Sequence, residues 1–162
     1  MIAVIDYDAG NIRSVEKALL ALGQEVHITG EPQEILRADK VILPRVGAFG
    51  DAMENIRSRG IEPVIRQITD RGTPFLGICL GLQLLFDSSE EAPGAKGLGL
   101  LKGRILRIPQ PPGMKIPHMG WNSLHLENDG KLFRGIEEQS YVYFVHSYYL
   151  RAEDKTIVKA ST

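Results

Sequence analysis

One short stretch, residues 72–86, limits the folds open to this chain more than any other. It reads Gly-Thr-Pro-Phe-Leu-Gly-Ile-Cys-Leu-Gly-Leu-Gln-Leu-Leu-Phe. The apolar run 75–78 predicts a buried strand, and 80–86 predicts the start of a helix. Cys79, the single cysteine of the chain, stands at the joint with a glycine two residues away on each side. A sharp strand-to-helix reversal needs such small flanking residues, because its backbone segments come into close contact.

This stretch therefore has the form of a nucleophile elbow, Gly-x-Cys-x-Gly, with Gly77 and Gly81 as its flanking residues. An elbow pushes its side chain out of the sheet and over the first free N–H groups of the helix, which favour a thiolate over a thiol. The alternative is that Cys79 is a small buried core residue, as free cysteines commonly are. The strand, the paired glycines and the helix together favour a reactive nucleophile.

Length and composition indicate one ordinary globular domain. The 162 residues suit a single sizeable core, and the formal net charge of -1 gives no reason to expect nucleic acid or an anionic membrane as a partner. A single cysteine allows no internal disulfide, so we expect a cytoplasmic protein. The amino terminus enters a strand pattern without the basic segment of a signal peptide, and no apolar run is long enough to span a bilayer.

The first half of the chain alternates between strand and helix patterns. Besides the elbow, we expect strands at 2–5, 25–29 and 40–43, and helices at 12–22, 31–38, 51–59 and 62–71. This alternation predicts an α/β fold with a mostly parallel sheet and helices on both faces. Active sites in such sheets lie beyond the carboxyl ends of the strands. The turn-rich loop 44–50 and Cys79 both follow strands, so we expect them to lie close together.

The second half of the chain has a different pattern. We expect strands at 101–108, 123–126, 141–146 and 156–160, a single helical turn at 130–134, and an irregular segment at 115–122 that contains the only tryptophan. The sequence stops just after a strand pattern, without a closing helix. On this pattern the domain looks incomplete.

A thiolate, an oxyanion hole and a base are the parts of acyl transfer through a thioester. An elbow offers the N–H group after the nucleophile, here that of Leu80, and the region of Gly47 is placed to supply a second. The base should be a histidine that a carboxylate orients. We expect surface roles for His27 and His125, whereas His118 lies in the irregular segment and His146 ends a strand. No histidine is followed by a suitable carboxylate, so the residues indicate a nucleophile without indicating its base.

Residues 72–83 resemble the nucleophile motif of class I (triad) glutamine amidotransferases. Three further segments, 44–53, 117–122 and 143–149, narrow the resemblance, as does 8–11 near the amino terminus. Together they resemble the family of glutaminase subunits of imidazole glycerol phosphate synthase. The resemblance covers the whole chain in order.

The resemblance implies a flavodoxin-like α/β fold, a single glutamine amidotransferase domain over residues 1–162, and a heterodimer with a separate (β/α)8-barrel cyclase. Cys79 would attack the carboxamide of L-glutamine, release ammonia and leave a glutamyl thioester for water to hydrolyse. The cyclase would use the ammonia to make imidazole glycerol phosphate and AICAR in histidine biosynthesis. The resemblance implies no metal and no other cofactor.

The resemblance also assigns roles to individual residues. The oxyanion would be served by Gly47 and Leu80. The residues that would line the glutamine pocket are Gln83, Glu91, His146, Ser147 and Tyr148. The residues that would lie toward the cyclase and help couple the two sites are Asn11, His118, Met119, Trp121 and Asn122. An irregular segment rich in proline and glycine favours a contact surface for Trp121 over an ordinary half-buried position.

Two departures from the family pattern affect the expected chemistry. The oxyanion loop of the family reads Pro-Gly-Val-Gly, and Arg45 stands here in place of its first glycine. Arg45 could restrict the loop, fix it in one state, or reach an anion or a partner. The triad histidine and glutamate of the family lie in a Phe-His-Pro-Glu type segment that the 162 residues do not contain. We therefore expect a chain that lacks the carboxyl-terminal elements and, as given, lacks normal glutaminase turnover.

Two other classes of function compete with a glutaminase subunit. A non-catalytic regulatory or binding partner of a synthase would explain the absent histidine and glutamate, but the intact Cys79 elbow speaks against it. Another cysteine-elbow hydrolase with the same fold would have no use for the cyclase-facing segment 117–122.

Overall fold

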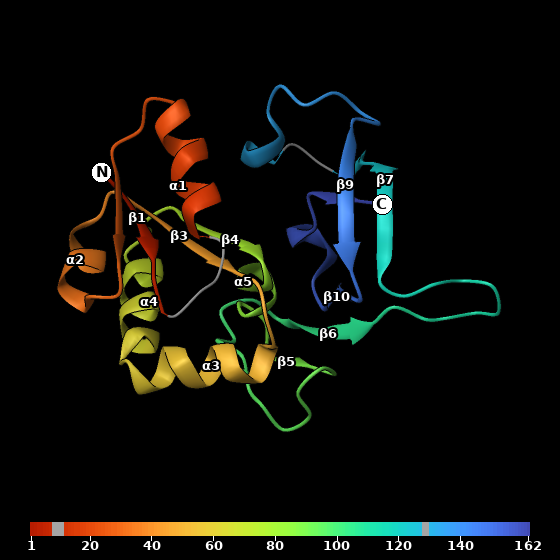
Figure 1. Ribbon diagram of the computed structural model, residues 1–162, viewed down its shortest axis with the longest axis horizontal. Helices are drawn as coiled ribbons and strands as arrows, with labels where there is room; N and C mark the ends of the chain where they lie inside the picture. Colours follow the sequence, from red (N-terminus) through yellow and green to blue (C-terminus); the bar gives the residue numbers. More distant parts are fainter. Residues whose placement is uncertain (8–11, 128–129) are drawn as a thin grey trace. The chain divides into compact units, whose positions relative to one another are not determined.

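A four-stranded parallel sheet organises the first part of the chain (Figure 1). The computed structural model describes residues 1–7, 12–127 and 130–162, and nothing of the Arg45 side chain. The strands lie in the order β2-β1-β3-β4, with β1 at Ile2–Ile5, β2 at Val26–Thr29, β3 at Lys40–Arg45 and β4 at Phe75–Cys79. This is the order in which a flavodoxin-like sheet begins, and it confirms the predicted α/β fold.

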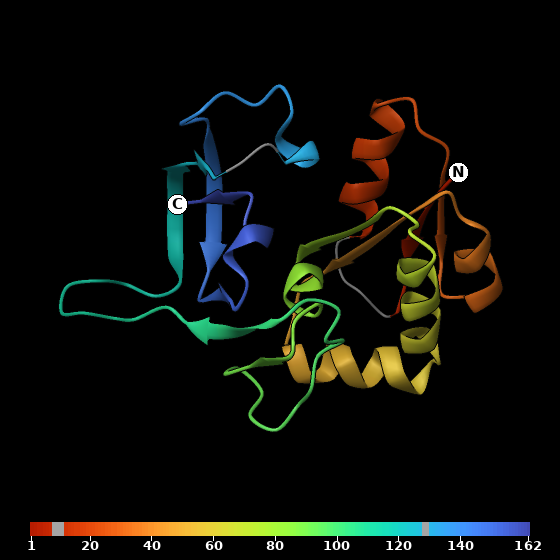
Figure 2. The same cartoon turned by 180° about the vertical axis from the view of Figure 1, so that it is seen from behind.

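Helices cover both faces of this sheet. The helices are α1 (Ile12–Ala21), α2 (Pro32–Arg37), α3 (Phe49–Ser58) and α4 (Ile61–Asp70). Crossovers between parallel strands are right-handed, and the chain moves from β1 to β2 in one direction and from β2 to β3 and β4 in the other. The first crossover therefore puts α1 on one face, and the later ones put α2 and α4 on the opposite face. Helix α2 contacts α4, as both views show (Figures 1 and 2).

Helical spacing of apolar residues explains how each helix attaches to the sheet. In α4 the residues at positions 1, 4, 5 and 8 of the helix are the buried ones, which makes one continuous apolar face: Ile61, Val64, Ile65 and Ile68. On the other side of the sheet, Ile12 of α1 packs with Ile2, Val4 and Ile42. Alternate residues of each strand thus supply two cores, one for each face.

The elbow joins β4 to the short helix α5 (Leu80–Gln83) by direct backbone contact. A Cβ atom added to Gly81 would lie 1.8 Å from the carbonyl oxygen of Leu43 in β3, and one added to Gly77 would lie 2.6 Å from the carbonyl oxygen of Gly81. No side chain fits at either distance. The close contact predicted for the paired glycines is confirmed.

The chain forms two compact units, Met1–Leu101 and Lys102–Thr162. The first unit also holds β5 (Ser88–Ser89). The second is built of antiparallel pairs. Strand β6 (Gly103–Arg107) pairs with β10 (Tyr148–Ala152), β7 (His118–Ser123) with β9 (Tyr141–His146), and β8 (His125–Leu126) with β11 (Ala160–Ser161). Two 3-10 turns, η1 (Lys131–Phe133) and η2 (Lys155–Ile157), complete it. Among the described residues, no helix has both the length and the apolar character needed to cross a membrane.

Most predicted elements are confirmed, and three predictions are wrong. The helix expected at 80–86 ends at Gln83. Of the strand expected at 156–160, only Ala160 lies in a strand, because 156–157 belong to the turn η2 and 158–159 have no regular secondary structure. Residues 118–123 form the regular strand β7 and are not irregular. Pairing along all six residues of β9 provides the backbone partners that the local glycine-containing sequence gave no reason to expect.

We predict that Gly81→Ala destabilises the protein far more than Gly23→Ala does. Gly23 has a φ of 70° and nothing within 4 Å of an added Cβ, so alanine there costs about 1 kcal/mol of backbone strain. At Gly81 the new methyl group meets a backbone oxygen that cannot move aside, so we expect a loss of about 3 kcal/mol or more. Chemical denaturation of both variants measures the difference. Equal losses would show that the contact between the elbow and β3 does not constrain the fold.

Candidate active site

Cys79 is exposed at the carboxyl end of β4, so the interpretation of this residue as a buried core cysteine is wrong. Its backbone has a φ of 56° and a ψ of -118°, a conformation that side-chain-bearing residues avoid. Such strain costs on the order of 1–3 kcal/mol and is concentrated at functional sites. The packing of Gly77 and Gly81 holds the strained residue in place. The local structure thus presents a thiol to solvent on a rigid support.

The loop expected beside Cys79 lies beside it in the structure. Strands β3 and β4 are parallel neighbours in which Pro44 pairs with Ile78 and Arg45 pairs with Cys79. Gly47 follows two residues after the end of β3 and has a φ of 120°, a value that favours glycine. The register therefore brings the segment containing Gly47 to the same edge of the sheet as the thiol.

Glu91 fixes the far end of that segment. Helix α3 begins at Phe49, and its N-cap residue Ala48 has no side chain that could cap it. The N–H group of Phe49 instead donates a hydrogen bond of 2.9 Å to the carboxylate of Glu91, which lies 42 positions later in the chain. A negative charge at the amino end of a helix is favourable. Glu91 thus binds Phe49, which lies two residues after Gly47, and one of its two carboxylate oxygens accepts this hydrogen bond.

The remaining predicted residues of the first unit follow Cys79 directly. Leu80 is buried and begins α5, so its N–H group is among those that have no partner within the helix. Gln83, the last residue of α5, is half-buried. Gly47 thus follows β3, and Cys79, Leu80 and Gln83 form the end of β4 and the helix α5, whereas Glu91 lies just after β5.

In the second unit, the structure joins two histidines that are 28 positions apart in sequence. His118 of β7 and His146 of β9 are opposite each other in the antiparallel register, and His118 Nδ1 lies 3.0 Å from His146 Nε2. His146 Nδ1 lies 3.0 Å from the carbonyl oxygen of Tyr148. Both ring nitrogens of His146 therefore have partners, and neither partner is a carboxylate. This environment does not resemble that of a triad base.

The strand β7 separates the residues expected to face a partner into two sets. Met119 and Trp121 lie on one face and are exposed, whereas His118 and Asn122 lie on the other and are half-buried. Tyr143, which the sequence did not single out, pairs with Trp121 across the strands, and the two ring centroids are 5.4 Å apart. The alternation of residues 141–146 in a predicted strand was the signal that could have identified it.

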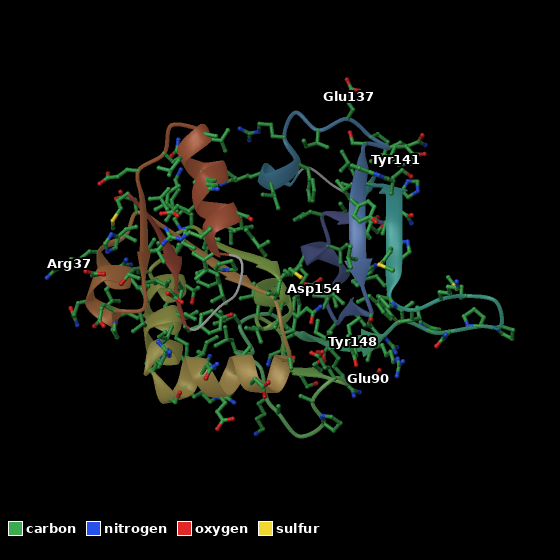
Figure 3. All side chains as sticks on the ribbon, in the orientation of Figure 1. Arg37, Glu90, Glu137, Tyr141, Tyr148 and Asp154 are labelled. Carbon is green, nitrogen blue, oxygen red and sulfur yellow. The ribbon has the colours of Figure 1, made fainter. Side chains whose placement is uncertain are left out.

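The other predicted residues have simpler settings. His27 and His125 are exposed and lie beside Glu34 and Glu138, at 2.9 Å and 3.1 Å, which confirms their surface positions. Ser147 and Tyr148 form the turn from β9 into β10, and Figure 3 shows Tyr148 near one end of β9 and Tyr141 near the other. Asn11 lies outside the described residues. Within the described part of the chain, no group of three or more histidine, cysteine or acidic residues could hold a metal ion.

The sequence matches a known family and several of its members. The family of class-I glutamine amidotransferases matches residues 3–162. The imidazole glycerol phosphate synthase subunit HisH of Moorella thermoacetica is 51% identical over 161 residues, which are 99% of this chain and 76% of that protein. The subunit of the same name from Methanocaldococcus jannaschii is 49% identical over 158 residues, which are 98% of this chain and 78% of that protein.

Solved structures support the fold. A crystal structure of a glutamine amidotransferase has a TM-score of 0.76 at 20% identity and covers 100% of this chain and 80% of its own. A second, from Thermotoga maritima, has a TM-score of 0.61 at 18% identity and covers 93% of this chain and 62% of its own. The chain therefore belongs to the class-I glutamine amidotransferase family and, within it, to the HisH subunits of imidazole glycerol phosphate synthase.

Proposed function

We propose that this protein is the glutaminase subunit of an imidazole glycerol phosphate synthase and supplies ammonia for histidine biosynthesis. The observation that carries the proposal is the exposed, strained Cys79, whose β4 strand pairs in register with the β3 strand that leads to Gly47. The names of relatives about 50% identical over nearly the whole chain support the same function. The partner in this proposal is a cyclase subunit, with which the chain forms a heterodimer in the cytoplasm.

In the proposed reaction, the Cys79 thiolate attacks the carboxamide carbon of L-glutamine and forms a C–S bond. The carbonyl oxygen becomes an oxyanion, for which the N–H groups of Leu80 and Gly47 are the proposed donors. The C–N bond then breaks, and the nitrogen takes up a proton and leaves as ammonia. Water hydrolyses the remaining glutamyl thioester to glutamate and regenerates the thiolate.

Five further residues are proposed to bind glutamine. We propose that Gln83, Glu91, His146, Ser147 and Tyr148 are the residues that bind glutamine. One Glu91 oxygen accepts from the Phe49 N–H group, so the other is the one available to the substrate amino group. Because the family match spans residues 3–162, we assign both units to one glutamine amidotransferase domain.

These residues do not explain how the leaving nitrogen receives its proton. His146 has a histidine and a backbone carbonyl as its partners, and the His-Pro-Glu segment of the family is absent from the 162 residues. General acid–base catalysis is typically worth about 10²–10⁴-fold in rate. The donor of this proton is therefore not assigned to any of the residues described above.

The partner surface is assigned to the exposed face of the β7–β9 ribbon. Its side chains are mostly apolar or aromatic and are 56–66% exposed: Met119, Trp121, Tyr141, Tyr143 and Val145. A contiguous exposed apolar face of this kind is typical of a protein interaction site. Trp and Tyr are also the residues that most often dominate binding energy. We propose that this face and Asn11 lie toward the cyclase, whereas His118 and Asn122 lie on the opposite, half-buried face of β7.

We predict that Cys79→Ala abolishes glutamine-dependent synthesis by the complex and leaves ammonia-dependent synthesis unchanged. The cyclase needs only ammonia, whereas glutamine cannot be opened without the thiolate. Product formation from each nitrogen source, measured with the gene product in complex with its cyclase, checks both halves. If both activities fell equally, Cys79 would have a structural role and would not be the nucleophile.

We predict that Trp121→Ala weakens binding to the cyclase by about 10-fold or more, because a large aromatic side chain at the centre of an interface dominates its affinity. Leu22→Ala is the control, since Leu22 is 73% exposed and lies outside the ribbon. Calorimetric titration of the two variants with the cyclase gives the ratio of their Kd values. Equal Kd values would assign the partner surface to another part of the chain.

A further inference from the structure

A chain of hydrogen bonds runs through the half-buried face of the β7–β9 ribbon. It links His118 to His146, and His146 to the backbone of Tyr148, over two contacts of 3.0 Å each. Phe144 packs against both rings, with centroid distances of 5.7 Å to His118 and 5.2 Å to His146. The other side chains on this face, Asn122 and Val142, are uncharged, so no charged group of the ribbon competes for the two rings.

The direction of this chain follows from the acceptor at its end. A carbonyl oxygen can only accept, so His146 Nδ1 carries a hydrogen and donates it to Tyr148. In neutral His146 the other nitrogen, Nε2, is then an acceptor, and the atom facing it is His118 Nδ1. His118 therefore donates from Nδ1.

The same contacts determine the shape of the turn at Ser147. The bond from His146 to the Tyr148 carbonyl spans this single residue, and the Ser147 carbonyl accepts a hydrogen bond of 2.9 Å from the N–H group of Ile108. The turn is thus held at two points, one by a backbone group and one by the His146 ring. The orientation of that ring depends in turn on His118.

We propose that His118 is a positioning residue for glutamine binding. It holds His146 in the Nδ1-protonated form and thereby fixes the Ser147–Tyr148 turn, which the proposed function places in the glutamine pocket. His118 acts from the face opposite Met119 and Trp121, so the same strand would present its other side to the cyclase. This role rests on the proposed function and differs from direct contact between His118 and the partner.

The test compares three substitutions of His118 in the complex with the cyclase. The amide nitrogen of Asn lies where Nδ1 lies in histidine, so His118→Asn keeps the donor. His118→Gln moves the amide away from that position, and His118→Leu removes the donor. We expect His118→Gln and His118→Leu to raise the KM for glutamine by about 5–10-fold, the usual effect of one lost hydrogen bond, with kcat changed less than about 2-fold. We expect His118→Asn to stay within about 2-fold of the unchanged protein, as should the ribbon control Ser123→Ala.

A spectroscopic measurement separates this proposal from the proposed function. ¹⁵N NMR of the imidazoles should show His146 protonated at Nδ1, the less common form of free neutral histidine, and this form should persist in His118→Asn and decline in His118→Leu. An unchanged KM in His118→Leu, failure of Asn to rescue, or His146 protonated only at Nε2 would overturn the proposal. Loss of the proposed function itself would appear separately, as glutamine-dependent synthesis that survives Cys79→Ala.

Discussion

The contact between the Gly81 backbone and the Leu43 carbonyl is the constraint on which the candidate active site depends. It brings the start of α5 against β3 so closely that no side chain fits between them. With that contact in place, the residue before α5 has little choice of backbone conformation, and Cys79 is held at a φ of 56°. The thiol is thus directed out of the sheet by packing of the surrounding backbone.

The same edge of the sheet carries other candidate residues of the first unit. Parallel pairing of β3 with β4 brings the Gly47 loop to Cys79, and Glu91 secures the start of α3 just after that loop. In the second unit, the alternation of side chains along β7 separates residues onto its two faces. It presents Met119 and Trp121 on one side of β7 and His118, which contacts His146, on the other.

Much of this arrangement was predictable because it is encoded locally. The glycines around Cys79 specify a close contact, and the spacing of Ile61, Val64, Ile65 and Ile68 specifies a helix with one buried face. Residues 118–123 were not predictable as a strand, because their order comes from pairing with β9, whose residues lie 18 to 28 positions later in the chain. The His118–His146 bond and the capping of Phe49 by Glu91 likewise depend on contacts between distant residues, which no local pattern reports.

The central claim is that Cys79 is a nucleophile directed at glutamine, and covalent labelling tests it most directly. A chloroketone analogue of glutamine places an electrophilic carbon where a thiolate attacking the carboxamide would meet it. Peptide mass spectrometry of the treated complex should find one modification, at Cys79, and excess L-glutamine should slow its formation. Labelling that is absent from Cys79, or that glutamine does not slow, would contradict the account.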